Sequence, residues 1–497
     1  MSTTNIDTLI GHIINGRDVA STGAPSGTVI SVNPYSGDAI WHAAAANATI
    51  VDAAVHAAQK ALASWMATPY EDRRELLSQF VKLVQRDATD LARLIAQEAG
   101  KPLWEAATEV NSLVTKFGAS VDAYAARAAE SSREVKGLRS RTRFMPHGVM
   151  AVLGPFNFPV SMANSHIMPS LLAGNTVVFK PSELTPVAGL LVSRLWQEAG
   201  LPPGVMNCVT GGRETGEQLV GHPDIDGVLF VGSYRVGMSI LHQLIDHPEK
   251  IVALEMGGNS PLVVLDYDDL DTAVHIIVQS TFLSAGQRCS AARRLFVPAT
   301  DRRIIERLTE VLSHLTIGDP LSTEPSPFYG PLIRQQAANG VLSRSGELMA
   351  AGAAAILQPT AIGPQRTVVT PGLLDMTTCT DDRDEEIFGP VLKVRRFENL
   401  GEAIRMANDT RFGLAAGIIC RDRARFDEFF DRTRAGIVNW NQQLTGATTL
   451  APFGGIKQSG NFRPAGFLSV DYCSYAVASF EVETPRIPES RSPGINF

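Results

Sequence analysis

The chain has 497 residues, of which 44% are apolar and 19% charged, with 42 Gly and 29 Pro. These proportions are those of an ordinary globular protein, and they exclude collagenous, disordered and disulfide-scaffold classes. The length corresponds to about three domains, or to one enzyme with a bilobed core. The formal net charge of −7 gives no general attraction to nucleic acid or to an anionic membrane, so neither is expected as a partner.

Cysteine usage and the N-terminus predict a cytoplasmic protein. The five cysteines are too few and too scattered for a disulfide framework, and their odd number fits a reducing compartment. Residues 1–16 contain Asp7 and no cationic or long apolar stretch, and no apolar run in the chain reaches about 18 residues. We therefore expect no export signal and no membrane span.

The N-terminal part is predicted to be helical. Residues 51–66 place apolar side chains at helical spacing, which predicts an amphipathic helix. Residues 71–99 repeat this pattern up to Gly100, which stands where a helix C-cap is expected. The first 130 residues are therefore predicted to be mainly α-helical.

From residue 149 onward, short apolar runs rich in β-branched residues alternate with helical stretches. Strands that are apolar on both faces and joined by helical crossovers form a parallel sheet covered on each side. The predicted strands are 149–153, 176–179, 205–210, 227–231 and 251–254. The pattern predicts a doubly wound α/β domain.

A second alternating series, after residue 260, predicts a second sheet. Its apolar runs are PLVVL, RRLFV, KVRRF, AAGIIC and GIVNWN. The pair Gly257 and Gly258 marks the predicted boundary, because glycine permits a sharp change of chain direction. The polar, proline-rich end TPRIPESRSPGINF is predicted to be an extended arm.

Three residues have the chemistry of carbonyl attack. Cys289, in SAGQRCSAARR, is surrounded by arginines, and nearby cations favour a thiolate, although most lone cysteines are structural. An attacking thiolate needs an oxyanion donor and an acid or base. Asn157, in GPFNFP, can supply an amide, although asparagine is common in proline-bounded turns. Glu255, in LEMGG, ends an apolar strand, where a carboxylate is costly unless it is paired or used.

Two strand ends are candidates for nucleotide binding. The segment GSYRVG, residues 232–237, follows an apolar strand and opens a helix, an arrangement that can cradle a pyrophosphate. Its spacing departs from GxGxxG, so a plain strand-to-helix turn is the alternative. In KPSE, Lys180 and Glu183 follow another strand and suit a ribose. The histidines are dispersed and no HxxxH or CxxC occurs, so no metal site is predicted.

Taken together, the motifs resemble the NAD(P)-dependent aldehyde dehydrogenase superfamily from about residue 10 to residue 480. The motifs that carry the likeness are GPFNFP, LLAGNTVVFKPSE, GLPPGVMN, FVGS, LEMGGNSP, SAGQRC, EEIFGP, RFGLAAGI, GIVNWN and APFGGIKQSG. The resemblance implies two doubly wound α/β domains with a small β arm. It also implies a nonstandard dinucleotide fold, which accounts for the missing GxGxxG.

The resemblance implies roles for the candidate residues. Cys289 resembles the nucleophile that forms a thiohemiacetal and then a thioester, Asn157 the side chain of the oxyanion hole, and Glu255 the base that activates the hydrolytic water. The implied cofactor contacts are Lys180 and Glu183, Gly232, Ser233 and Gly237, and Glu386, Phe388 and Phe156. A carboxylate at Glu183 repels the 2′-phosphate of NADP and accepts the 2′-hydroxyl of NAD, so NAD is the predicted cofactor.

The resemblance also implies a division of the chain. Residues 1–130 and 148–256, with a segment returning at about 451–471, are expected to bind NAD, and residues 257–450 to form the catalytic domain. Residues 131–147 and 472–497 are expected to form an oligomerisation arm, in which YAVASFEV can add a strand to a neighbouring chain. A homodimer or homotetramer is expected.

Several stretches resemble a bacterial subgroup that oxidises N-succinyl-L-glutamate 5-semialdehyde to N-succinyl-L-glutamate in arginine catabolism. They include KPLWEAATEV, GGRETG, HPEKIVALEMGGN, GNFRP and DYCSYAVAS. Another semialdehyde dehydrogenase, for succinate, glutarate or glutamate semialdehyde, is the nearest alternative. A NAD-binding protein without activity and a cysteine hydrolase without nicotinamide are more distant alternatives.

A small anionic semialdehyde with two carboxylates needs local cations or backbone donors, since the whole chain is acidic. The candidate contacts are Lys116, Arg288, Thr445 and Gly446. For Lys116 the alternative is an ordinary solvated helix lysine. For Arg288 the alternatives are an arginine that tunes the thiolate and one that pairs with a structural carboxylate.

Overall fold

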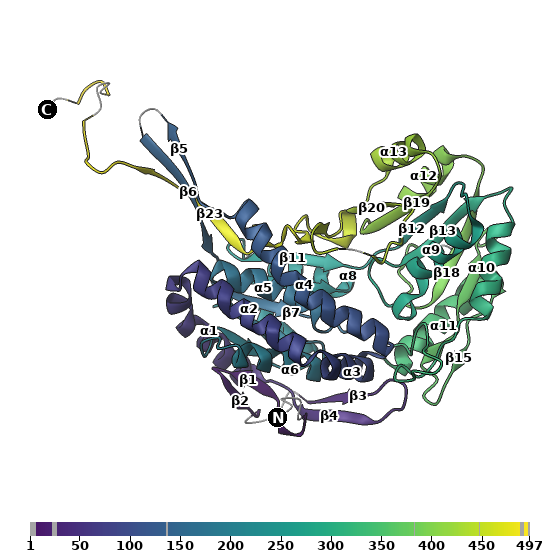
Figure 1. The fold of residues 1–497 in the computed structure, drawn as a ribbon, viewed down its shortest axis with the longest axis horizontal. Coiled ribbons are helices and arrows are strands. Elements are labelled where there is room, and N and C mark those ends of the chain that lie inside the picture. Colours follow the sequence, from purple (N-terminus) through teal and green to yellow (C-terminus); the bar gives the residue numbers. More distant parts are fainter. Residues whose placement is uncertain are drawn as a thin grey trace.

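The computed structural model describes residues 6–21, 27–135, 138–381, 383–446, 448–487 and 492–495. Two seven-stranded sheets and a three-stranded arm carry the fold (Figure 1). Residues 1–5, part of the expected signal-free N-terminus, lie outside the described residues, as do 136–137, 488–491 and 496–497 of the expected arm. Within the described residues, no helix combines the length and the apolar composition that crossing a bilayer requires.

The N-terminal part is less uniformly helical than predicted. Two short hairpins come first, formed by β1 (His12–Ile14), β2 (Arg17–Val19), β3 (Thr28–Val32) and β4 (Ala39–Ala44). Four helices follow: α1 (Ala48–Ala67), α2 (Tyr70–Arg86), α3 (Ala88–Ala99) and α4 (Leu103–Arg127). The predicted helix over 71–99 is thus two helices that meet at Asp87. Gly100 ends the second one in the left-handed conformation, with φ 73°, which glycine adopts without steric cost.

The first sheet confirms the predicted parallel α/β pattern. Its order is β11-β10-β7-β8-β9-β1-β2, and β7 to β11 run parallel. The parallel strands are β7 (Val149–Leu153), β8 (Thr176–Lys180), β9 (Met206–Cys208), β10 (Gly227–Gly232) and β11 (Ile251–Met256). The connecting helices are α5 (Ser161–Ala173), α6 (Pro186–Glu198), α7 (Arg213–Val220) and α8 (Tyr234–Gln243).

Alternate residues of these strands enter different cores. Val152 and Val177 pack in a cluster with α2 and α6, where the rings of Phe80 and Trp196 stack 3.6 Å apart. Ala151 and Val178 pack in a second cluster, with α1 and α8. Burial on both sheet faces explains why the strands read as unbroken apolar runs instead of alternating ones.

The second sheet has the order β14-β17-β18-β13-β12-β19-β20. Its strands are β12 (Ser260–Val264), β13 (Ala292–Pro298), β14 (Ala354–Leu357), β17 (Gly372–Asp375), β18 (Val391–Phe397), β19 (Ala415–Ile419) and β20 (Ile437–Trp440). Its helices are α9 (Leu270–Phe282), α10 (Arg303–Ser313), α11 (Gln335–Ala350), α12 (Leu400–Asn408) and α13 (Arg423–Arg432). Short pairs join β15 (Ala361–Ile362) to β16 (Val368–Val369) and β21 (Pro452–Phe453) to β22 (Ala465–Gly466).

A three-stranded sheet projects from the body as an arm, at the upper left of Figure 1. It contains β5 (Ser131–Val135), β6 (Leu138–Pro146) and β23 (Ser474–Glu481), in the order β23-β6-β5. The strand expected to join a neighbour, β23, pairs over all its residues with β6 of its own chain. Its other edge carries no strand among the described residues.

Candidate active site

Four of the predicted site residues lie at or just after the ends of adjacent parallel strands. Asn157 comes after β7, Lys180 ends β8, Ser233 follows β10 and Glu255 is the second-to-last residue of β11. Because parallel strands present their carboxyl ends at one edge, these residues share a single edge of the first sheet. The chain then crosses from β11 to β12 through Gly257 and Gly258, so the second sheet begins beside this edge.

Cys289 follows a tight turn that connects α9 to β13. Ser284, Ala285 and Gly286 of this turn have φ values of 55°, 53° and 71°. Left-handed backbone is unfavourable for Ser and Ala, and it persists only where surrounding contacts enforce it. A Cβ on Gly286 would collide with the carbonyl of Gly389, so the turn packs directly against the segment before β18.

The sulfur of Cys289 meets the carboxylate of Glu255 across the junction of the two sheets. The thiol donates to Oε1 of Glu255 at 3.5 Å. Glu255 is 3% exposed, and its Oε2 has no hydrogen-bond partner among the described residues. Burial raises the pKa of Glu255 to about 8, against the opposing effects of the Cys289 thiol and the Lys116 ammonium. A carboxylate with this pKa can exchange protons near neutral pH.

The expectation that neighbouring arginines favour a thiolate at Cys289 is wrong. Burial raises the pKa of the thiol well above its usual value, and Glu255 and Glu386 raise it further. The arginines are engaged elsewhere: Arg293 pairs with Glu386 at 3.3 Å, and Arg294 donates to the carbonyl of Asn259 at 2.8 Å. The surroundings of Cys289 therefore favour the neutral thiol over the thiolate.

The side chain of Asn157 is hydrogen-bonded to the backbone of the segment that carries Cys289. Its Nδ2 donates to the carbonyl of Gln287 at 2.9 Å, two residues before Cys289. The second hydrogen of this amide and the backbone N–H of Cys289 have no acceptor among the described residues. Two donors of this kind can stabilise an oxyanion.

The predicted pyrophosphate segment has the expected local structure. Ser233 caps α8, its Oγ accepting the N–H of Val236 at 3.4 Å. The remaining N–H groups of the first helical turn are available to an anion. Gly237 lets α8 lie close to the sheet, because a Cβ there would collide with the sulfur of Met256.

Of the two residues predicted to contact the adenosine ribose, Glu183 is exposed and Lys180 is buried. Lys180 donates to the carbonyl of Pro181 at 3.0 Å. Its Nζ lies 3.9 Å from Glu183, whose side chain is 48% exposed. The carboxylate of Glu183 therefore has lone pairs left for a ligand's hydroxyl groups.

The segment that contains Glu386 and Phe388 lies against the nucleophile turn. Burial raises the pKa of Glu386 to about 7 against the effect of Arg293, and the rings of Phe388 and Phe156 meet edge to face at 6.0 Å. Gly257 leaves room for Glu386, since a Cβ there would collide with Oε2 of that carboxylate.

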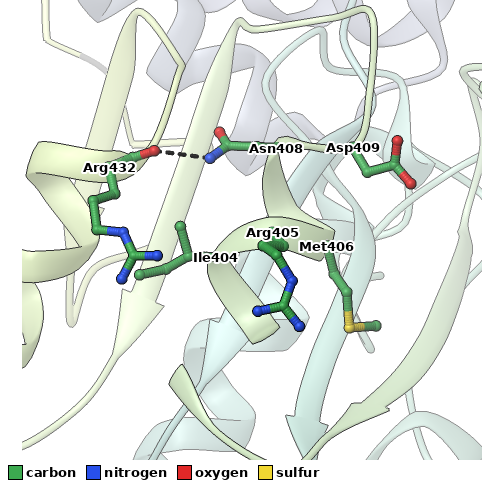
Figure 2. A pocket seen from close by; sticks show the side chains of 6 residues that line it. All are labelled: Ile404, Arg405, Met406, Asn408, Asp409 and Arg432. Atoms are coloured by element: carbon green, nitrogen blue, oxygen red, sulfur yellow. Dashed lines mark hydrogen bonds between the residues drawn. The ribbon is translucent and has the colours of Figure 1, made fainter. Parts of the chain in front are cut away.

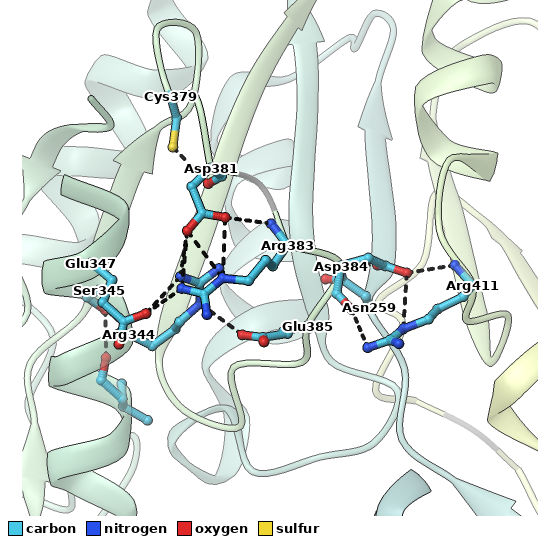
Figure 3. A network of polar contacts seen from close by, with 11 residues as sticks. Asn259, Arg344, Ser345, Glu347, Cys379, Asp381, Arg383, Asp384, Glu385 and Arg411 are labelled. Atoms are coloured by element: carbon cyan, nitrogen blue, oxygen red, sulfur yellow. Dashed lines mark hydrogen bonds and ion pairs between the residues drawn. The ribbon is translucent and has the colours of Figure 1, made fainter. Parts of the chain in front are cut away.

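Hydrogen bonds around Asp384 anchor this segment (Figure 3). Asn259 donates to Oδ1 of Asp384 at 2.8 Å, and the backbone N–H of Arg411 donates to Oδ2 at 2.6 Å. Arg344 pairs with the adjacent Glu385 at 2.9 Å. The segment that leads to Glu386 is thereby held from both sides.

The structure brings the predicted substrate contacts near Cys289 but gives them different surroundings. The view of Lys116 as a solvated lysine is wrong, because it is 6% exposed. Burial lowers its pKa to about 8, against the charges of Glu255 and Glu109. Among the described residues its ammonium group has no hydrogen bond or ion pair, so it is a buried cation without a direct partner.

Arg288 is largely engaged by protein groups. It donates to Ser284 Oγ at 2.9 Å, to the carbonyl of Thr445 at 3.1 Å and to Glu105 at 2.7 Å. Pairing with a structural carboxylate was one of the alternatives considered for it. Thr445 donates its hydroxyl to the carbonyl of Gln279 at 2.8 Å, whereas Gly446 is exposed. The loop at 445–446 therefore adjoins the nucleophile turn.

Sequence reasoning missed three buried charges in KPLWEAATEV. Lys101, Glu105 and Glu109 all lie in the interior beside the predicted site. Glu105 and Glu109 lie one turn apart on α4, and Lys101 lies two residues before the helix begins. Ala106, Val110 and Leu113 are buried nearby. Charges at helical spacing among buried apolar residues were the signal available.

A hollow of about 530 Å³ lies elsewhere, at the end of α12 (Figure 2). None of the predicted site residues lines it. Its lining residues are Ile404, Arg405, Met406, Asn408, Asp409 and Arg432. In the described part of the chain, no three His, Cys, Asp or Glu side chains gather as a metal site would require.

Comparisons with known proteins agree with this arrangement. The aldehyde dehydrogenase family model matches residues 22–476. N-succinylglutamate 5-semialdehyde dehydrogenases from Escherichia coli O81 (strain ED1a) and Enterobacter sp. (strain 638) are each 46% identical over 486 residues. These matches cover 97% of this chain and 98% and 97% of theirs.

Solved structures of aldehyde dehydrogenases share the fold. The aldehyde dehydrogenase from Brucella melitensis biovar abortus 2308 matches with a TM-score of 0.90 and 30% identity, covering 98% of this chain and all of its own. The 1-pyrroline-5-carboxylate dehydrogenase from Thermus with bound NAD matches with a TM-score of 0.89 and 29% identity, covering 95% and 92%. The chain therefore belongs to the aldehyde dehydrogenase family, and it is an oxidoreductase that acts on aldehydes in a family that uses NAD or NADP.

Proposed function

We propose that the protein oxidises N-succinyl-L-glutamate 5-semialdehyde to N-succinyl-L-glutamate with NAD, through a thioester on Cys289. The contact between the Cys289 sulfur and Glu255, beside the Asn157 amide, carries the proposal. The relatives that are 46% identical over nearly the whole chain bear the name of this substrate.

The proposed chemistry begins at the sulfur. Glu255 takes the thiol proton as Cys289 attacks the aldehyde carbon, because its Oε1 is the base within 3.5 Å. The amide of Asn157 and the backbone N–H of Cys289 stabilise the thiohemiacetal oxyanion. A nicotinamide bound at the sheet edge would accept the hydride that this intermediate loses. Glu255 releases the thiol proton to solvent and then takes a proton from the water that hydrolyses the thioester.

The residues that would hold the cofactor lie along the carboxyl edge of the first sheet and in the segment of Glu386. Ser233 and the first turn of α8 hold the pyrophosphate, with Gly232 and Gly237 allowing close approach. Lys180 and Glu183 hold the adenosine ribose. Glu386 holds the nicotinamide ribose, beside the ring pair of Phe156 and Phe388. The exposed carboxylate of Glu183 favours NAD, because it repels the 2′-phosphate of NADP.

Recognition of the substrate carboxylates is assigned first to Lys116. A buried ammonium without a direct partner gains a charge-assisted hydrogen bond when an anionic group enters. The backbone at Thr445 and Gly446 supplies further donors for the substrate carboxylates. Arg288 supports this loop through the carbonyl of Thr445, and it reaches a substrate carboxylate only with its remaining hydrogens.

The assembly and the compartment complete the proposal. We place the reaction in the cytoplasm, where a reactive cysteine stays reduced. The arm formed by β5, β6 and β23 joins copies of the chain into a homodimer or homotetramer. Apolar side chains that are exposed on this arm support that assignment, among them Tyr475 and Phe480.

A substrate panel tests the proposal. NADH formation is measured with the succinylated semialdehyde and with succinate, glutarate and glutamate semialdehydes, and NADPH formation is measured with NADP in place of NAD. We expect kcat/KM for the succinylated substrate with NAD to exceed each competitor by at least about tenfold. A higher kcat/KM for another semialdehyde would contradict the proposed substrate, and a higher kcat/KM with NADP would contradict the proposed cofactor. Cys289→Ala is the blank.

A further inference from the structure

A row of three buried charges, one just before α4 and two in its first two turns, reaches both loops of the active site. Lys101, Glu105 and Glu109 are buried and spaced by four residues. Burying charge is costly unless each group is paired and hydrogen-bonded. Here Glu105 and Glu109 are hydrogen-bonded to the segments that carry the reacting residues, and Lys101 is bonded to Glu109.

Glu109 fixes the loop that carries Asn157. Its Oε1 accepts the backbone N–H groups of Val160 and Ser161, each at 3.1 Å, at the start of α5. Its Oε2 accepts Lys101 at 2.7 Å. The ammonium of Lys101 in turn lies 3.5 Å from the ring centre of Phe158, the residue next to Asn157. The loop is thus held by its backbone and by an aromatic side chain.

Glu105 fixes the turn that carries Cys289. Its Oε1 accepts Arg288 at 2.7 Å and also accepts the hydroxyl of Ser284, one of the left-handed residues. Arg288 lies 5.1 Å from the same ring of Phe158. The two cations therefore contact one aromatic side chain, which couples the Asn157 loop to the Cys289 turn.

The surroundings of Glu105 favour its charged form in the folded protein. Burial raises the pKa of Glu105, but Arg288, Lys101 and Ser284 together lower it by more, so the carboxylate is ionised. Burial lowers the pKa of Lys101, and Glu109 and Glu105 oppose this effect. Ionised partners give the stronger, more directional hydrogen bonds that hold a strained turn in place.

We propose that Lys101, Glu105 and Glu109 are positioning residues that hold the Asn157 amide and the Cys289 sulfur in register for attack on the aldehyde. The proposal rests on the proposed function of Cys289 and Asn157. None of the three residues contacts the reacting atoms. A misplacement of about 1 Å at such a pair can lower the rate by about 100-fold.

The test separates positioning from a purely structural role. Glu105→Gln, Arg288→Met and the double variant are compared with wild type for Tm, for kcat with propanal, and for KM of NAD. We expect Glu105→Gln to lower Tm, because it leaves Arg288 buried without its charge partner. We expect its kcat to fall by about 10- to 100-fold, with KM for NAD within about twofold of wild type.

The double variant gives the decisive result. The double variant contains no buried arginine without a charge partner, so its Tm should recover toward wild type. Its kcat should stay low, because the hydrogen bonds that hold the Cys289 turn are still missing. Recovery of kcat together with Tm would overturn the proposal, as would a wild-type kcat in Glu105→Gln. If Glu105→Gln does not fold, Ser284→Ala is used instead. It keeps all charges, and a fall in kcat at unchanged Tm supports the proposal, whereas an unchanged kcat overturns it.

A matched control and the wild type distinguish other failures. Asp226 accepts the backbone N–H of Val149 at 2.7 Å, at the amino end of β7 and away from the reacting residues. Asp226→Asn should leave kcat unchanged, and a fall equal to that of Glu105→Gln would overturn the specific role. A wild type that forms no NADH from any aldehyde would instead contradict the proposed function, and with it this inference.

Discussion

Burial controls the ionisation of Cys289, Glu255 and Lys116. It raises the pKa of the thiol, raises that of Glu255 to about 8, and lowers that of Lys116 to about 8. In water these three groups would titrate several units apart. In this interior, Glu255 and Lys116 exchange protons in the same range, where a general base is most useful.

The raised pKa of Glu255 predicts how turnover depends on pH. The carboxylate is mostly protonated below about pH 8, so the hydrolytic step lacks its base there and gains it as the pH rises. We expect kcat to increase with pH, with its midpoint near pH 8, and to level off at higher pH. A steady-state profile of NADH formation from pH 6 to 9.5 measures this. A kcat independent of pH over that range would contradict the role of Glu255.

Replacing Lys116 should produce two separable effects. Lys116→Met removes a buried cation, so KM for the succinylated substrate should rise by about tenfold or more, while KM for propanal should change little. The pH limb of kcat should also move upward, because the ammonium lowers the pKa of Glu255.

The exposed helix residue Lys82 provides the control for this variant. Lys82→Met should change neither KM nor the pH profile, because its ammonium lies at the surface of α2. Equal losses in KM for the charged substrate and for propanal would show that Lys116 does not recognise the substrate carboxylates.

Local patterns predicted where the candidate residues lie along the chain, but not what surrounds them. Asn157 and Glu255 follow strands that the apolar runs predicted, and these strands lie at one edge. The burial of Lys116 and the engagement of Arg288 by Glu105 depend on α4 packing against α5 and the nucleophile turn. Such contacts join residues far apart in sequence, so spacing alone does not predict them.

Among the elements, strands with strong apolar runs were predicted best. The run at 227–231 is β10 with one added residue, whereas the run at 205–210 forms only the three residues of β9. The predicted helix over 71–99 divides at Asp87, whose side chain favours caps and turns. Helical periodicity continues across that break, which is why the pattern did not detect it.

The connection between β11 and β12 gives a prediction at this scale. A Cβ on Gly257 would collide with the carboxylate of Glu386, so Gly257→Ala should displace that side chain. Overpacking of this kind costs about 1–3 kcal/mol, and we expect KM for NAD to rise by about tenfold with kcat less affected. Steady-state kinetics with varied NAD measures the change.

Gly340 in α11 is the matched position for Gly257. A Cβ there meets nothing within 4 Å, so Gly340→Ala should leave KM unchanged and raise stability by about 0.5–1 kcal/mol. A wild-type KM for NAD in Gly257→Ala would contradict the contact between this junction and Glu386.

At the scale of the whole molecule, the arm formed by β5, β6 and β23 projects away from the body of the chain (Figure 1). Phe480 is 65% exposed, and Tyr475, Val477 and Val135 are also exposed on the same small sheet. Apolar side chains gathered on a projecting sheet are typical of an interface. The edge of β23 can also pair with another chain.

Disruption of the arm should therefore change the assembly. Light scattering of the wild type should give two or four times the chain mass of 53.4 kDa, and Phe480→Glu should shift the mass toward one chain. Ile245→Glu, at an exposed apolar residue away from the arm, is the control and should keep the wild-type mass. A monomeric wild type, or an unchanged mass in Phe480→Glu, would contradict an oligomerisation role for the arm.

The acylation of Cys289 is the central claim for the molecule as a whole, since it needs the nucleophile of one sheet and the cofactor edge of the other. Glu255→Gln lacks the base of both steps, so it should form the thioester slowly and hydrolyse it more slowly still. After a long incubation with NAD and N-succinyl-L-glutamate 5-semialdehyde, intact-protein and peptide mass spectrometry should find one acyl group per chain, on the peptide that contains Cys289. An acyl group on another residue, or NADH formation at the wild-type rate by Cys289→Ala, would contradict the account.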